Sequence, residues 1–82
     1  QYEQLELLQT AKQKITKSLE IHPESSEGWY LYGSCLNELG RYFGEEDYYI
    51  QAIEKFQYGL SLARNHPLLW YGLALAHFAL GE

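Results

Sequence analysis

The sequence predicts an all-α fold of antiparallel helix-turn-helix repeats, with about four helices in one domain over residues 1–82. Three observations predict this fold. Apolar residues recur at helical spacing, never in strand-like alternation. Two proline-containing segments, IHPESSE and ARNHP, divide the chain into short units. One phrase occurs twice: WYLYGSCLNELG covers residues 29–40, and WYGLALAHFALG begins 41 residues later.

The first predicted helix lies before Pro23. Pro23 ends it, because the ring disfavours helical geometry at His22 and proline has no backbone N–H to donate. One face of this helix carries apolar and small residues, namely Leu5, Leu8, Ala11, Ile15, Ser18 and Leu19.

The second helix is expected to begin near Ser25 or Ser26, whose hydroxyls can cap free backbone N–H groups. It is expected to run to about Leu39, with Gly40 as a left-handed stop. Gly44 then breaks the chain a second time.

The third helix is expected to begin at Glu45, Glu46 and Asp47, where the helix macrodipole favours negative charge. Consecutive helical residues fan ~100° apart, so these carboxylates form a poor metal site. The fourth helix is expected from about Leu68 to Leu80 and is apolar all round. The stripe of the third helix is Tyr49, Ala52, Ile53, Phe56, Leu60 and Ala63.

Composition excludes several classes of protein. A formal net charge of -5 argues against nucleic-acid binding, which needs clustered basic residues. The lone Cys35 cannot form an internal disulfide, so we expect an intracellular, cytoplasmic protein. No apolar run reaches the ~20 residues of a membrane-spanning helix. Because the chain contains no methionine, we expect it to be a piece of something longer.

Sliding the sequence over itself by 41 residues aligns much of the chain. A fixed period of this size is typical of solenoids, in which each unit buries its apolar face against the next. The aligned pairs include Ala11 with Ala52, Lys14 with Lys55, Leu19 with Leu60, Trp29 with Trp70, Tyr30 with Tyr71, and Gly40 with Gly81.

These residues resemble the tetratricopeptide repeat, whose signature is W-x2-L-G-x2-Y, then A-x3-F, then proline. The first part is matched by Trp29, Tyr32, Gly33 and Leu36, and again by Trp70, Leu73, Ala74 and His77. The second part is matched by Ala11, Ile15, Ser18 and Pro23, and again by Ala52, Phe56 and Gly59.

The resemblance implies a right-handed solenoid. Residues 1–23 would be the second helix of one repeat, 25–65 a complete helix pair, and 67–82 the first helix of another. The period exceeds the family's ~34 residues by about seven, around FGEEDYY. These residues would either add two turns to the third helix or form a projecting loop with Tyr42 and Phe43 at its tip.

The resemblance also assigns packing roles. Small residues are expected where helices approach closely, and Phe56 and the two tryptophans are expected to fill the space between helices. Cys35 is expected to be a small buried hydrophobe and not a nucleophile. The small residues concerned are Gly33, Ala74, Ser18 and Gly59.

The resemblance implies a protein–protein interaction module, acting as scaffold, adaptor or chaperone, that binds a peptide along a concave face. No basic clamp for a carboxylate is present, so an apolar or weakly basic peptide is expected, with tyrosines as anchors. The expected binding residues are Glu27, Tyr30, Ser34, Asn37 and Glu38 from one pair, with Leu68, Tyr71, Leu75 and Phe78 from the next.

Two alternatives stay open. Leu75 and Phe78 could pack against a further helix, or residues 67–82 could join two copies in a self-assembly module without a groove ligand. An enzyme is the remote alternative, because no zinc spacing, nucleophile elbow or phosphate loop occurs. No catalytic residue, metal or cofactor is predicted.

Overall fold

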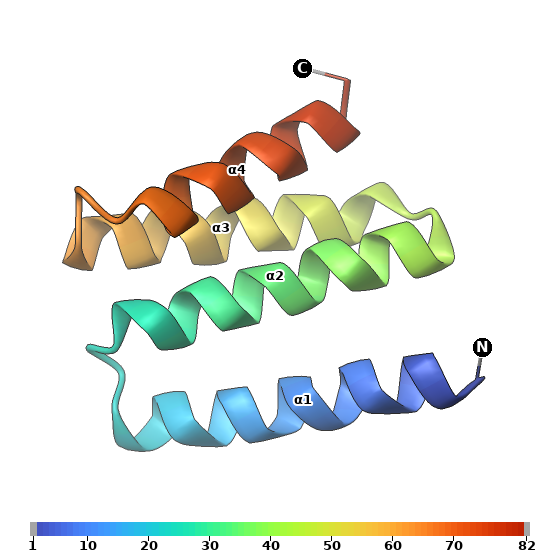
Figure 1. The fold of residues 1–82 in the computed structure, drawn as a ribbon, viewed down its shortest axis with the longest axis horizontal. Coiled ribbons are helices and arrows are strands. Elements are labelled where there is room, and N and C mark those ends of the chain that lie inside the picture. The colour runs from blue at the N-terminus through green and yellow to red at the C-terminus, as the bar shows by residue number, and fades with distance from the viewer. Residues whose placement is uncertain (1, 82) are drawn as a thin grey trace.

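The computed structural model describes residues 2–81 and contains four helices in this range. They are α1 (Tyr2–Ile21), α2 (Ser26–Phe43), α3 (Glu46–Leu62) and α4 (Pro67–Ala79). Figure 1 shows that successive helices run antiparallel, with α1 and α4 on opposite sides of the molecule. The predicted all-α helical-repeat fold is confirmed. The predicted boundaries 1 and 82 lie outside the described residues.

Local signals set the beginning of α2. The chain leaves α1 at Ile21, before Pro23, and turns back at Ser25. The Ser25 Oγ accepts a hydrogen bond from the Gly28 backbone N–H at 3.1 Å. This bond satisfies one of the free donors of the first helical turn, as expected for a serine N-cap.

The helix α2 ends later than the sequence predicts, at Phe43 and not near Leu39. Gly40 does not stop the helix; it is buried within α2, and a Cβ there would lie 2.8 Å from the Tyr49 ring. The left-handed residue is Gly44, with φ 69°, and its N–H donates to the Gly40 carbonyl oxygen at 2.7 Å. Gly40 therefore serves close packing between α2 and α3, and Gly44 serves the turn.

The additional residues of the 41-residue period lengthen both helices of the pair. Tyr42 and Phe43 form the last turn of α2, so the projecting loop is wrong, and the extension is not confined to the third helix. The Phe43 ring stacks on Tyr48 of α3, with centroids 5.6 Å apart. Aromatic contacts thus close the end of the α2–α3 pair.

Phe56 of α3 lies at the centre of the core. It is 0% exposed, and its ring occupies the places where side chains of Gly33 on α2 and Gly72 on α4 would begin. Because both glycines admit the same ring, α2 and α4 pack on α3 side by side. The buried cluster is Leu36, Leu39, Ala52, Phe56, Leu60, Leu69 and Ala76.

The two tryptophans have the same hydrogen bond but different burial. The indole Nε1 of Trp29 donates to the Pro23 carbonyl oxygen, and that of Trp70 donates to the Arg64 carbonyl oxygen, both at 2.8 Å. Trp29 is half-buried against Tyr58, whereas Trp70 is 53% exposed. Trp70 therefore stabilises the turn between α3 and α4 through its hydrogen bond and does not fill space between helices.

Two of the four predicted close-packing residues are also wrong. Ser18 and Ala74 are exposed, whereas Gly33 and Gly59 are buried at close approaches. Ser18 and Ala74 lie on sides of α1 and α4 that face no other helix among residues 2–81.

Candidate functional site

The candidate site is a groove between α2 and α4. The close approach at Phe56 brings the two helices together and leaves one side of each open. Two adjoining hollows, about 190 and 440 Å³ in volume, share Asn37, Glu38, Tyr71 and Leu75. We call this continuous surface the α2–α4 groove. Its lining is Tyr30, Ser34, Asn37, Glu38, Arg41, Tyr49, Tyr71, Gly72, Leu75, Phe78 and Ala79.

Most of the residues predicted for the concave face meet in this groove. Glu27 and Leu68 do not line it; both are exposed in the first turns of α2 and α4. The predicted residues that line it are Tyr30, Ser34, Asn37, Glu38, Tyr71, Leu75 and Phe78. Their role in binding stays a prediction.

Four of the lining residues were not predicted from the sequence. Arg41 and Ala79 follow Glu38 and Leu75 by about one helical turn, so helical periodicity could have found them. Gly72 lies one helical turn before Leu75, so it carried the same signal. Tyr49 carried no such signal and enters because it packs over Gly40.

The two predicted tyrosines of the groove differ in exposure. Tyr30 is half-buried, with its ring 6.4 Å from Phe56 and stacked at 6.4 Å on His66. Tyr71, at the equivalent position of the repeat, is 60% exposed. Tyr30 is thus a fixed wall of the groove, and Tyr71 is an aromatic surface open to a ligand.

Asn37 connects the two walls. Its side chain is only 8% exposed, and Nδ2 donates to the Gly72 carbonyl oxygen of α4 at 3.3 Å. The Oδ1 atom is buried and has no hydrogen-bond partner. An unsatisfied buried acceptor costs about 1–3 kcal/mol, so this atom favours the approach of a donor.

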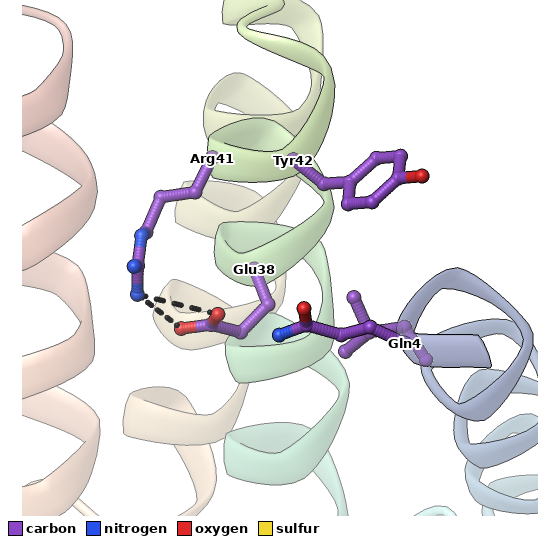
Figure 2. A pocket seen from close by; sticks show the side chains of 5 residues that line it. Gln4, Glu38, Arg41 and Tyr42 are labelled. Atoms are coloured by element: carbon purple, nitrogen blue, oxygen red, sulfur yellow. Dashed lines mark hydrogen bonds and ion pairs between the residues drawn. The ribbon is translucent and has the colours of Figure 1, made fainter. Parts of the chain in front are cut away.

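Glu38 and Arg41 form an ion pair on the open side of α2. Arg41 Nη1 lies 3.2 Å from Glu38 Oε2, and the two side chains are 72% and 45% exposed. Figure 2 shows Glu38 between Arg41 and Gln4 of α1. The pair borders both the α2–α4 groove and a hollow of about 140 Å³ between α1 and α2. Arg41 therefore offsets the negative charge of Glu38 at the edge of the groove.

Cys35 lies on α2 and is half-buried. Burial raises the pKa of its thiol above the ordinary value of 9.0, and the negative charge of Glu38 raises this pKa further. Lys12 opposes the shift by favouring the thiolate. The thiol is therefore protonated at neutral pH, which suits a packing residue better than a nucleophile.

Two other kinds of site are absent from the described part of the chain. Residues 2–81 contain no cluster of His, Cys, Asp and Glu that could hold a metal ion. No helix in that range is both long and apolar enough to cross a membrane.

Antiparallel helices that repeat at a fixed offset and leave a groove between alternate members define a helical-repeat protein. The family model for the tetratricopeptide repeat matches residues 15–46, which supports the tetratricopeptide-like helical repeat that the residues of this segment predict. The matched segment contains the end of α1 and all of α2. Neither the comparison with curated proteins nor that with solved structures found a match. Tetratricopeptide repeats are generally protein–protein interaction modules and are typically non-catalytic.

Proposed function

We propose that the chain binds an extended peptide segment of a partner protein in the α2–α4 groove. The observation that carries the proposal is the buried, unpaired Oδ1 of Asn37 within a groove whose other lining residues are mainly aromatic or apolar. A backbone N–H of the peptide would satisfy this oxygen after a small shift of the Asn37 side chain, because the atom is buried in the free chain. One apolar side chain of the same peptide would pack against Tyr71 and Leu75, which are 60% and 44% exposed.

The charges near the groove favour an apolar peptide with a weakly basic character. Glu27 is exposed at the beginning of α2, and the charge of Glu38 is offset by Arg41. The chain carries a formal net charge of -5, so a cationic segment would be attracted over longer distances. Capture of such segments would suit a scaffold, an adaptor or a chaperone.

A peptide library displayed on phage and selected against the chain tests the proposal. Tyr71→Ala removes the exposed anchor, and we expect it to weaken binding of the selected peptides by about tenfold or more, in line with an interface hot spot. Tyr2→Ala is the matched control, because Tyr2 is 83% exposed on α1, away from the groove. Selected peptides that bind Tyr71→Ala and the unsubstituted chain equally would contradict the proposal.

Asn37→Leu tests the hydrogen bond separately from the apolar contacts. Leucine is close to asparagine in size and lacks both polar atoms. We expect the variant to fold and to lose affinity for the selected peptides. A second comparison uses peptides N-methylated one backbone position at a time. One position should be sensitive with the unsubstituted chain and insensitive with Asn37→Leu.

A further inference from the structure

We propose that the chain binds an arginine side chain of a partner protein in a separate hollow, on a different side of α2 from the α2–α4 groove. The hollow has a volume of about 350 Å³. We call it the Trp29 hollow. None of its lining residues lines the α2–α4 groove, so the proposal is independent of peptide binding there. Its lining is Thr16, Leu19 and Glu20 of α1, Pro23 of the following turn, and Trp29 and Tyr32 of α2.

The Trp29 hollow lies within the array of helices. Figure 1 shows α2 between α1 on one side and α3 and α4 on the other. Among residues 2–81, α1 does not contact α3, and the strip of α2 that carries Trp29 and Tyr32 is only half-buried. The α3 helix contacts the same two rings, because Tyr58 packs against Trp29 and Lys55 lies over Tyr32. Both helices that flank this strip are therefore described.

Trp29 and Tyr32 form a nearly flat aromatic platform. Their rings are 16° from parallel, with centroids 6.1 Å apart. The indole N–H of Trp29 is held by the Pro23 carbonyl oxygen at 2.8 Å, and the Tyr58 ring packs against the indole at a centroid distance of 4.5 Å. The platform is thus ordered before a ligand arrives, which reduces the entropy lost on binding.

The platform already holds one cation of the chain itself. Lys55 Nζ lies 5.1 Å from the centroid of the Tyr32 ring. Aromatic faces attract cations through the ring quadrupole, and a planar guanidinium stacks on such faces in a way that a compact ammonium cannot. The aliphatic stem of an arginine would pack on the apolar lining at Leu19 and Pro23. The platform therefore suits an arginine side chain.

Glu20 supplies the complementary charge. It is the charged residue of the lining, and it is exposed. Within residues 2–81 it forms no ion pair with a basic side chain. A free carboxylate can accept two parallel hydrogen bonds from a guanidinium, which fixes the orientation of the group as well as its charge. Glu20 beside the platform thus favours arginine over an uncharged side chain.

The second unit of the repeat provides a comparison within the chain. Trp70 is the equivalent of Trp29 and makes the same 2.8 Å hydrogen bond to its turn. The carboxylate and the second aromatic ring are not repeated. The tryptophan therefore belongs to the repeat, whereas the features that would bind arginine occur in one unit. The two differences are Ser61 in place of Glu20 and Leu73 in place of Tyr32.

Titration of the unsubstituted chain with Nα-acetyl-arginine amide, followed by ¹H–¹⁵N NMR, is the first test. The indole N–H signals of Trp29 and Trp70 report on the two equivalent places, and Trp70→Phe assigns them. We expect the Trp29 signal to shift and to saturate in the millimolar range, because the ligand is small. The Trp70 signal should shift little. An unchanged Trp29 signal, or equal shifts of both signals, would overturn the proposal.

Nα-acetyl-citrulline amide is the matched control ligand, because citrulline has the shape of arginine without its charge. We expect it to bind about fivefold more weakly, which corresponds to the loss of one exposed ion pair. Nα-acetyl-lysine amide keeps the charge without the planar group and should also bind more weakly. Citrulline or lysine binding as tightly as arginine would contradict the assignment of the ligand.

Two variants then locate the contacts. Glu20→Gln keeps the size of an exposed side chain and should weaken arginine binding about fivefold, with citrulline binding unchanged. Glu6→Gln is the matched control, because Glu6 is exposed on the same helix and does not line the hollow. Tyr32→Leu installs the residue of the second unit and should also weaken arginine binding. Equal arginine affinities for Glu20→Gln and Glu6→Gln would overturn the proposal.

Discussion

The indole Nε1 of Trp70 donates a 2.8 Å hydrogen bond to the carbonyl oxygen of Arg64, in the turn between α3 and α4. The same bond, also 2.8 Å long, joins Trp29 to Pro23 in the turn between α1 and α2. Both bonds span six residues. The repeated tryptophan therefore ties each first helix to the turn that precedes it, and this role is independent of how deeply the ring is buried.

Substitution of the two tryptophans should separate the hydrogen bond from the packing. We expect Trp29→Phe and Trp70→Phe to lower the free energy of unfolding by similar amounts, about 1 kcal/mol each, because each loses one hydrogen bond. Trp29→Ala should cost more than Trp70→Ala, because only Trp29 packs against Tyr58. Urea unfolding followed by far-UV circular dichroism measures all four values. Equal costs for the two alanine variants would contradict this assignment.

The contact between Gly72 and Phe56 should be intolerant of added volume. A Cβ at position 72 would lie 2.4 Å from the Phe56 ring, and that ring is 0% exposed. Gly72→Ala should therefore destabilise the chain by about 1–3 kcal/mol, despite the better helix propensity of alanine. Thermal or urea unfolding measures the loss.

A double-mutant cycle provides the control for this steric explanation. Phe56→Leu shortens the side chain that meets position 72, so the Gly72→Ala substitution should cost less in that background. Additive costs in the double variant would show that a cause other than this clash is responsible.

Gly44 should be required for the turn between α2 and α3. Its φ of 69° lies in the left-handed region, and no atom lies within 4 Å of a Cβ placed there. Gly44→Ala should therefore cost about 1–2 kcal/mol from backbone strain alone. Gly44→Asn should cost less, because asparagine tolerates this conformation better. Equal losses for the two variants in urea unfolding would contradict the explanation.

The thiol of Cys35 should react slowly with Ellman's reagent at neutral pH. Its folded-state pKa is raised by burial and by Glu38, so the thiolate is scarcer than in an exposed cysteine. Glu38→Gln should lower this pKa and speed the reaction. The comparison chain is Cys35→Ser with Ala74→Cys, whose thiol is placed at an exposed position. Equal rates in the two chains from pH 7 to 9 would contradict the shift.

The same raised pKa makes stability depend on pH. The unfolded chain releases the Cys35 proton at a lower pH than the folded chain does. The stabilisation is therefore complete below the unfolded pKa and is lost as pH rises through the folded pKa. Urea unfolding at increasing pH should show a loss above about pH 9 that Cys35→Ser lacks.

The sequence by itself determined the helices and their order. Proline and serine mark the turn between α1 and α2, because their effects act within a few residues. The 41-residue offset predicted equivalent roles for equivalent positions, and the matching hydrogen bonds of Trp29 and Trp70 are an example. The resemblance to the tetratricopeptide repeat also predicted one shared surface for Tyr30, Asn37 and Tyr71 before any tertiary contact was known.

Only the tertiary structure decided which equivalent residues are buried. Gly33 faces Phe56, whereas its equivalent Ala74 is exposed, because α3 covers α2 and no helix among residues 2–81 covers that side of α4. The choice between Gly40 and Gly44 as the end of α2 likewise depended on Tyr49, which packs over Gly40 from another helix. Local sequence specifies conformation through interactions along the chain, whereas burial depends on which surfaces meet.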